Sequence, residues 1–435
     1  MEFSEFGKKF TDKAGILSLM DDMGRAMGGG RDVIMMGGGN PGYVPEFQEM
    51  VRNRLLQICA DPREFQRLVG IYNPPQGEQG FIENLAGLLR REYGWPVGAE
   101  NICLTNGSQT GFFLLFNMFA GEFPGKIRKK IRLPLTPEYI GYTDIGLSRD
   151  FFVATRPRID YLEDHLFKYR VDFNAILPGE ETGAICVSRP TNPTGNVVTD
   201  EEMARLDLLA RLHGVPLIID SAYGLPFPGM VYSDAQPIWN ENIIVCLSLS
   251  KLGLPAVRTG IIVATQEVIG AVSGMNAIMS LAPGNFGAIL ARGMVGTGEI
   301  LRLSKNVIRP FYGDKLEKAL MRIQTEFAGI PYRIHRPEGA MFLWLWFEEL
   351  PITSLELYER LKKRGVLVIS GHYFFPGLEG DPWRHKNECL RVTYSQNEHQ
   401  VAEGIKRIAE EVRRAFSEGE QGGTGRCGGA SLDGQ

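Results

Sequence analysis

Cysteine and histidine are scarce in this sequence of 435 residues, which contains six of each. The cysteines are scattered without a CxxC pair, and most lie in apolar runs. This pattern predicts buried thiols in a reducing compartment, and it argues against a disulfide framework or a zinc site. The histidines show no HExxH or related spacing, so we expect no metal centre.

Long hydrophobic runs and a strong charge imbalance are also missing. No apolar run approaches the roughly 18 residues that a membrane-spanning helix needs, and the N-terminal residues lack the basic and apolar segments of a signal peptide. The formal net charge is −4, which favours neither nucleic acid nor anionic membranes as partners. These absences predict a cytoplasmic protein that acts on small molecules.

The chain is long enough for a large and a smaller domain, at about 150 residues per domain. Short apolar runs alternate with helical patterns through the first two thirds, as in a mostly parallel sheet covered by helices. The strands are predicted at 102–105, 131–135, 152–154, 184–188, 217–220 and 243–247, and the helices at 45–60, 81–90, 110–120, 140–148 and 201–213.

A long helical pattern over 300–327, interrupted at Pro310, leads into a second set of elements. These are strands near 341–347, 366–369 and 390–394 and helices at 354–364 and 398–416. We expect a large domain over 45–300, a small domain formed by 1–44 and 301–416 with an N-terminal arm, and a disordered tail over 417–435, which has almost no apolar side chains.

Lys251 lies shortly after the apolar run 243–247, in the stretch SLSK. Lysine is rarely buried unless it is paired, and a desolvated amine with a lowered pKa is what Schiff-base chemistry requires. A lysine at a strand end more often extends its amine to water when it is considered alone. The residues at the other strand ends decide between these interpretations.

Two groups of residues near strand ends suit a phosphate. Gly107-Ser108-Gln109 opens a predicted helix, where free N–H groups and a hydroxyl favour an anion, although a simple helix cap gives the same pattern. Arg258 follows Lys251 by seven positions, and Ser248 and Ser250 precede that lysine. One turn therefore combines two hydroxyls, an amine and a guanidinium.

Other strand ends carry residues that suit an aromatic ring. Tyr139 could cover a flat ring, although plain packing explains a loop tyrosine more often. Asn192 is fixed as a donor in the rigid turn RPTNPTG, and Tyr223 follows Asp220 by three residues. Asp220 ends an apolar strand, where a carboxylate is costly to bury unless it meets a cation, and an arginine would serve equally well. Together these groups describe pyridoxal 5′-phosphate, which carries an aldehyde, a phenolic oxygen, a basic ring nitrogen and a phosphate.

The order of these motifs resembles the class I and II aminotransferases of the aspartate-aminotransferase-like family, over about 30–415. NGSQ, PEY, RPTNPTG, DxxY and SLSK with a later arginine carry the resemblance. GGGNP, TPEYIGY, SLSKLGLP, PEGAMFLWLWF and GHYFFPGL further resemble a bacterial branch that exchanges amino groups between L-valine and pyruvate. The resemblance implies an α/β protein of fold type I, with a mostly parallel seven-stranded sheet in the large domain and a smaller α/β domain.

The resemblance also implies a role for each residue. Lys251 would bind the cofactor aldehyde and then move the proton, Asp220 would keep the ring nitrogen protonated, and Tyr139 would stack on the ring; these are the predicted catalytic residues. The predicted cofactor-binding residues are Gly107, Ser108, Gln109, Tyr139, Asn192, Asp220, Tyr223, Ser248, Ser250, Lys251, Arg258 and Tyr72.

Tyr72, in YNPPQG, matches a tyrosine that reaches the phosphate of the neighbouring subunit, which implies a homodimer with shared sites. Arg391 fits the arginine that clasps the substrate α-carboxylate in bidentate fashion. Gly38, Gly39 and Asn192 are the other predicted substrate contacts, and the implied substrates are amino acids and 2-oxo acids. Apolar candidates for the pocket of the substrate side chain are Ile16, Leu17, Tyr43 and Phe342.

Two features depart from the family pattern. Ser221 replaces the usual acidic residue after the ring aspartate, and the spacing from Lys251 to Arg258 is one residue shorter than in many members. Both affect the phosphate contacts. The alternatives are another reaction of the same cofactor, such as aromatic or broad-specificity transamination or C–S β-elimination, and a cofactor-binding regulator. A regulator would carry a DNA-binding module, and no such pattern precedes residue 30.

Overall fold

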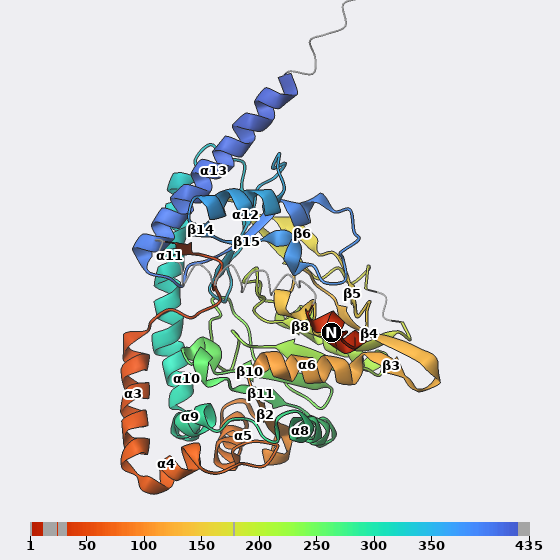
Figure 1. Cartoon of the computed structure of the whole chain (residues 1–435), viewed down its shortest axis with the longest axis vertical. Helices are drawn as coiled ribbons and strands as arrows, with labels where there is room; N and C mark the ends of the chain where they lie inside the picture. Colours follow the sequence, from red (N-terminus) through yellow and green to blue (C-terminus); the bar gives the residue numbers. More distant parts are fainter. Residues whose placement is uncertain (1, 12–23, 25–32, 177–178, 425–435) are drawn as a thin grey trace, which may run out of the picture.

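The computed structural model of the chain describes residues 2–11, 24, 33–176 and 179–424. Its largest sheet has eight strands in the order β2-β11-β10-β9-β8-β4-β3, with β5 paired to β4 (Figure 1). The strands are β2 (Ile102–Thr105), β3 (Gly121–Phe123), β4 (Ile127–Leu133), β5 (Phe152–Ala154), β8 (Thr182–Ser188), β9 (Leu217–Asp220), β10 (Ile243–Ser248) and β11 (Gly260–Val263).

The expected mostly parallel sheet is confirmed. All of the strands predicted for it are present and run parallel to one another, while β11 lies antiparallel between β10 and β2 and completes the seven. β3 adds an eighth strand as a short hairpin with β4. The carboxyl ends of β4, β8, β9 and β10 therefore meet at one edge of the sheet, where a parallel sheet gathers its functional loops.

Helices cover both faces of this sheet because its strands are apolar on both sides. On one face, side chains such as Cys103 and Ile218 pack with α6 (Ser108–Phe119) and α8 (Gln266–Ser280). On the other, neighbours such as Leu104 and Ile219 pack with another set of helices. That set comprises α5 (Gln79–Tyr93), α7 (Asp200–Leu212) and α9 (Phe286–Thr297).

A second sheet has the order β15-β16-β13-β12-β7-β6. Its strands are β6 (Arg158–Tyr161), β7 (Leu166–Arg170), β12 (Arg333–His335), β13 (Phe342–Trp346), β15 (Ile369–Ser370) and β16 (Cys389–Thr393). The hairpin of β6 and β7 comes from within the predicted large domain and pairs with β12. Nearby, β1 (Ile34–Met35) pairs with β14 (Val366–Leu367). The domain boundaries 45–300, and 1–44 with 301–416, stay a prediction.

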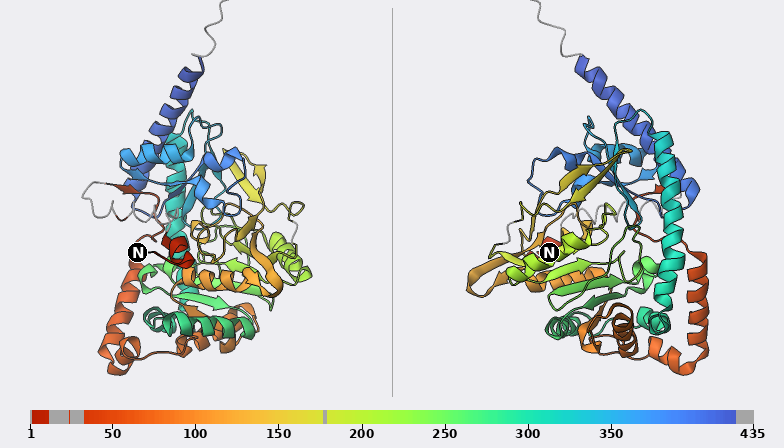
Figure 2. Two further views of the ribbon diagram at one scale, coloured as in Figure 1. Left: turned by 45° about the vertical axis from the view of Figure 1, so that its right-hand side comes forward. Right: turned by 180° about the vertical axis from the view of Figure 1, so that it is seen from behind.

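The remaining helices link and cover the two sheets. The expected helix over 300–327 is present as α10 (Glu299–Leu303), a π-helical turn (Ser304–Ile308) and α11 (Arg309–Glu326), and the irregular turn directly precedes Pro310. Figure 2 shows α11 running from the helices that cover the first sheet to the elements around the second sheet. The others are α1 (Glu5–Thr11), α3 (Pro45–Ala60), α4 (Pro62–Val69), α12 (Ser354–Lys363) and α13 (Glu398–Thr424). Among the described helices none is long and apolar enough to cross a membrane.

Two sequence predictions of secondary structure are wrong. Residues 140–148 form a single 3₁₀ turn (Ile140–Tyr142) followed by bends, because the side chain of Asn117 bonds the backbone of Ile145 and Leu147. Residues 417–424 continue α13 instead of being disordered, and Glu418 there forms an ion pair with Arg360. The rest of the predicted tail, 425–435, lies outside the described residues.

Most of the predicted buried thiols are confirmed. Four of the five cysteines in the described residues are buried without a disulfide, and Cys59 on α3 is exposed.

A buried ion pair fixes the second sheet against the loop that follows Asn192. Lys168 on β7 contacts Glu338, and its amine also donates to the carbonyl oxygen of Val197 at 3.1 Å. The amide of Val197 in turn donates to Glu338 at 3.1 Å. We expect Glu338→Ala to lower the free energy of unfolding by about 3–5 kcal/mol, because it leaves the Lys168 ammonium buried without a counter-ion.

Urea unfolding of the purified protein measures this loss. Glu299→Ala is the matched control, because Glu299 pairs with Arg302 on the surface, and such pairs contribute about 1 kcal/mol or less. Equal losses for the two variants would contradict the expected role of the buried pair.

Candidate active site

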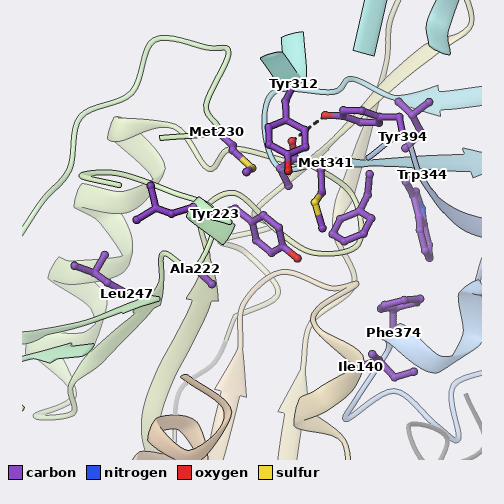
Figure 3. Packing of buried hydrophobic residues seen from close by; sticks show 14 of the residues in the cluster. Ile140, Ala222, Tyr223, Met230, Leu247, Tyr312, Met341, Trp344, Phe374 and Tyr394 are labelled. Carbon is purple, nitrogen blue, oxygen red and sulfur yellow. Dashed lines mark hydrogen bonds between the residues drawn. The ribbon is translucent and has the colours of Figure 1, made fainter. Parts of the chain in front are cut away.

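A cavity of about 270 Å³ opens at the carboxyl edge of the first sheet. It brings together most of the residues predicted from sequence, although they are spread over 350 positions of the chain. The predicted residues that line it are Gly39, Ser108, Gln109, Tyr139, Asn192, Asp220, Tyr223, Ser248, Ser250, Lys251, Arg258 and Arg391. Figure 3 shows Tyr223 beside Ala222, with its hydroxyl on the side of Ile140 and Phe374.

Lys251 points its amine into this cavity. It lies in a 3₁₀ turn (Ser250–Leu252) directly after β10, and its Nζ donates to the carbonyl oxygen of Gly39 at 2.6 Å. Burial lowers the pKa of this amine to about 8, and the charges of Arg391 and Arg258 act in the same direction. The interpretation of a strand-end lysine that extends to water is therefore excluded.

Asp220 is a buried carboxylate at the end of β9. Its Oδ2 accepts a hydrogen bond of 2.6 Å from the hydroxyl of Tyr142, and its Oδ1 accepts one of 2.9 Å from the amide of Ala222. Burial raises the pKa of Asp220, whereas both hydrogen bonds and the charge of Lys251 oppose that rise. No arginine of the described residues forms an ion pair with this carboxylate, which leaves it suited to a cation on a bound ligand.

Arg391 is a buried cation on β16, in the second sheet. It donates 2.7 Å and 2.6 Å hydrogen bonds to the side-chain oxygen of Asn192 and the carbonyl oxygen of Gly37. Its guanidinium also lies 4.2 Å from the ring centre of Phe342. Burial lowers the pKa of Arg391 to about 10, and no carboxylate of the described chain pairs with it. A buried guanidinium without a counter-ion suits a substrate carboxylate.

The first turn of α6 and Arg258 form an anion site at the mouth of the cavity. Gly107 precedes the helix in a left-handed conformation, with φ of 87°. This backbone conformation favours glycine, and a Cβ there would lie 2.3 Å from the guanidinium of Arg258 and displace it. Arg258 pairs with no carboxylate in the described residues, and it faces the free amides of the helix. Cation and helix N-terminus together suit a phosphate group.

Comparison with known proteins identifies the family in which this arrangement of residues occurs. The family model for aminotransferase class I and II matches residues 58–408. The chain belongs to this family.

The similarity to individual relatives extends over nearly the whole of this chain. The valine–pyruvate aminotransferase of Escherichia coli K12 is 49% identical over 421 residues, which cover 96% of this chain and all of the relative. The crystal structure of a protein from Psychrobacter arcticum is 47% identical, with a TM-score of 0.94 and coverage of 96% of this chain and 99% of that one. The valine–pyruvate aminotransferase of Salmonella typhimurium is 48% identical, with a TM-score of 0.86 and coverage of 93% and 100%.

Class I and II aminotransferases use pyridoxal 5′-phosphate, which when bound withdraws electrons from the amino acid. The residues of this cavity fit that cofactor. Lys251 offers an amine to its aldehyde, Asp220 lacks the cation that the ring nitrogen would supply, and Arg258 lacks an anion. In addition, the side-chain oxygen of Gln109 at the wall of the cavity is buried without a hydrogen-bond partner in the described chain.

Some predicted residues lie away from the aminotransferase cavity. Tyr72 is 81% exposed and Gly38 is buried beside the lining residues. Ser221, the departure from the family pattern, is buried and also stays outside the lining. Among the apolar candidates, Tyr43 is 72% exposed and Phe342 packs under Arg391 instead of lining the cavity. Ile16 and Leu17 lie outside the described residues.

Sequence reasoning missed several residues of this aminotransferase site, and three of them contact residues that it predicted. Tyr142 holds Asp220, Gly37 holds Arg391, and Glu138 lies fully buried beside Tyr139. Tyr142 is the second tyrosine of TPEYIGY, and this motif could have pointed to it. It was overlooked because residues 140–148 were expected to form a helix. Gly37 lies in the glycine run that the sequence assigns to close backbone contact with a ligand.

The lowered pKa of Lys251 predicts how its amine reacts in the cofactor-free enzyme. Only the neutral amine is nucleophilic, so labelling at Lys251 by an acylating reagent should rise with pH around a midpoint near 8, well below the ordinary lysine value of 10.5. Mass spectrometry of the peptide that contains Lys251 measures this midpoint.

Arg391→Met serves as the companion variant. It removes the cation that lowers the lysine pKa most strongly after burial, so the midpoint should move upward. A wild-type midpoint near 10.5, unchanged in this variant, would contradict the electrostatic account.

Proposed function

We propose that the protein transfers the amino group of L-valine reversibly to pyruvate, giving 3-methyl-2-oxobutanoate and L-alanine. The 49% identity with the Escherichia coli valine–pyruvate aminotransferase over its full length supports the choice of substrates. The unpaired guanidinium of Arg391 beside the amine of Lys251 supports the reaction type, since one binds the α-carboxylate and the other reaches the α-carbon.

The proposed roles follow from the contacts of each residue. Arg391 orients the substrate through a bidentate pair with the α-carboxylate, and Asn192 holds the guanidinium in that direction. With the cofactor bound, Lys251 would take the proton of the substrate α-carbon onto its Nζ and give it up again; a pKa near 8 suits both transfers at neutral pH. Asp220 keeps a proton on the ring nitrogen, and Tyr142 fixes the orientation of that carboxylate.

The other cavity residues are proposed to bind the cofactor as the sequence predicts. Tyr139 covers the ring face, and Asn192 and Tyr223 bond the phenolic oxygen. Ser248, Ser250 and Arg258 hold the phosphate together with the amides of 107–109. The amide of Ser250 donates to the hydroxyl of Ser248 at 3.1 Å, which leaves that hydroxyl hydrogen free for the phosphate.

We further propose a homodimer with shared sites. Tyr72 at 81% and Leu281 at 58% exposure are parts of an apolar surface that also includes Ile71, Val69 and Phe286. Asn285 ties the two segments of this surface together through hydrogen bonds to Asn73 and to the backbone of Ile71. The surface continues to the anion site at the first turn of α6, because Asn106, next to Gly107, forms hydrogen bonds with Ser280 and Gly284. A second copy on this surface could therefore bring its Tyr72 to the phosphate.

Half-reactions test the proposed chemistry directly. Valine should bleach the absorbance of the purified yellow enzyme, and pyruvate should restore it. Lys251→Ala should lose amino-group exchange between these substrates while it remains folded, because among the described residues no other lysine lines the cavity. Exchange that persists in Lys251→Ala would refute the mechanism.

The same half-reactions distinguish the alternative substrates. Faster bleaching by phenylalanine would favour an aromatic or broad-specificity enzyme, and pyruvate released from cystathionine would favour C–S elimination. A cytoplasmic location stays a prediction from the sequence.

Combining two impaired variants tests the shared site. Tyr72→Ala should weaken cofactor binding by roughly ten- to a hundredfold, the loss expected for a hydrogen bond to a charged group. Co-expression of Tyr72→Ala with Lys251→Ala should restore activity, because one site of the mixed dimer then has an intact Tyr72 and an intact Lys251. A monomer in analytical ultracentrifugation, or no complementation, would rule out the shared site.

A further inference from the structure

Glu138 joins three segments that border the cavity. Its Oε1 accepts a 2.8 Å hydrogen bond from the amide of Ser188, and its Oε2 accepts one of 2.5 Å from the hydroxyl of the same serine. The amide of Tyr139 also donates to Oε2 at 3.3 Å. On the other side, the backbone amide of Glu138 donates to the carbonyl oxygen of Phe374 at 2.8 Å.

Each of these segments carries a group of the site. Tyr139 lines the cavity from the loop after β4, and Ser188 ends β8 just before the turn with Asn192. Phe374 comes from the second unit, and its ring centre lies 5.2 Å from the guanidinium of Arg391. Glu138 therefore lies where three segments meet: the loop that carries Tyr139, the turn that carries Asn192, and the segment whose Phe374 packs beside Arg391.

This carboxyl group is fully buried and has no ion-pair partner in the described chain. Burial raises its pKa to about 8, the charge of Asp220 adds to that rise, and the bonds from Ser188 and Tyr139 oppose it. Asp220 is the register neighbour of Ser188 across β8 and β9, so two buried carboxyl groups flank one serine. Burying two carboxyl groups this close together is costly for folding, and the hydrogen bonds from Ser188 and Tyr139 offset only part of that cost.

We propose that Glu138 is a positioning residue for the cofactor ring: through Ser188 and the Tyr139 amide, its carboxyl group holds the Tyr139 side chain over the ring that Asp220 binds. This inference rests on the proposed function for its substrate assay only. The hydrogen bonds supply the orientation and the charge does not, so an amide of the same shape should replace the carboxyl group. Its oxygen would accept from the Ser188 amide and its NH₂ would donate to the Ser188 hydroxyl, whereas the longer contact of 3.3 Å from the Tyr139 amide would lose its acceptor.

Glu138→Ala and Glu138→Gln, each purified with cofactor, test this role. The visible circular dichroism of the bound cofactor reports the orientation of the ring. In Glu138→Ala this signal should change, the dissociation constant of the cofactor should rise, and kcat with valine should fall roughly ten- to a hundredfold, as expected for a misplaced reacting group. KM for valine should stay within about threefold, because Arg391 still binds the carboxylate. Glu138→Gln should retain the dichroism and most of kcat.

Ser188→Ala is the second variant, in case Glu138→Ala does not fold. It removes one of the same hydrogen bonds from the other partner, so it should shift the dichroism in the same direction by a smaller amount. Glu411→Gln is the matched control, because Glu411 is equally buried but lies on α13, which contributes no residue to the cavity. This control should leave the dichroism unchanged.

Two results would overturn the inference. One is a folded Glu138→Ala protein with wild-type dichroism and kcat, whether or not its melting temperature falls. The other is a Glu138→Gln protein as impaired as Glu138→Ala. The dichroism and the cofactor affinity do not depend on the substrate. If the wild-type enzyme proved inactive with valine, these two readouts would still decide the role of Glu138, and only the proposed substrate would fail.

Discussion

The site depends on charged side chains that are largely or fully removed from water but held only by neutral partners. The amine of Lys251 bonds a carbonyl oxygen, the guanidinium of Arg391 bonds an amide and a carbonyl, and the carboxylate of Asp220 bonds a hydroxyl. Neutral hydrogen bonds fix direction but do not replace the lost hydration of a charge. The cavity is therefore arranged for a ligand that brings an anion, a ring cation and a carboxylate to positions already prepared.

The fold brings these charges together from two separate sheets. Asp220 and Lys251 follow parallel strands of the first sheet, whereas Arg391 lies within a strand of the second. The glycine segment near residue 37 joins them, because Gly37 bonds Arg391 and Gly39 bonds Lys251. A Cβ at Gly37 would lie 2.9 Å from the carbonyl oxygen of Val368, so a side chain there would push the segment out of place.

The sequence predicts the parts of the fold that follow local pattern. β2, β5 and β9 have the predicted boundaries because their apolar runs are short and end at turn residues or at a polar side chain. β11 was missed although Ile261–Val263 is a β-branched apolar run, because the run is short and comes directly after the turn of Arg258. The β6–β7 hairpin was missed because its strands mix polar and apolar residues. Their place in the second sheet depends on pairing with β12, which lies far along the chain.

The residues of the site are likewise only partly predictable from the sequence. Residues suited to contact a ligand can be recognised by their type and position, as Asp220 can at the end of an apolar strand. Residues that hold others in place, such as Tyr142 and Glu138, become visible only through the partner that the fold supplies. Because those partners are buried charges or their neighbours, the site destabilises the cofactor-free protein. A ligand that binds only the folded state recovers this stability in proportion to its affinity, so the groups that weaken the empty protein are those that make cofactor binding tight.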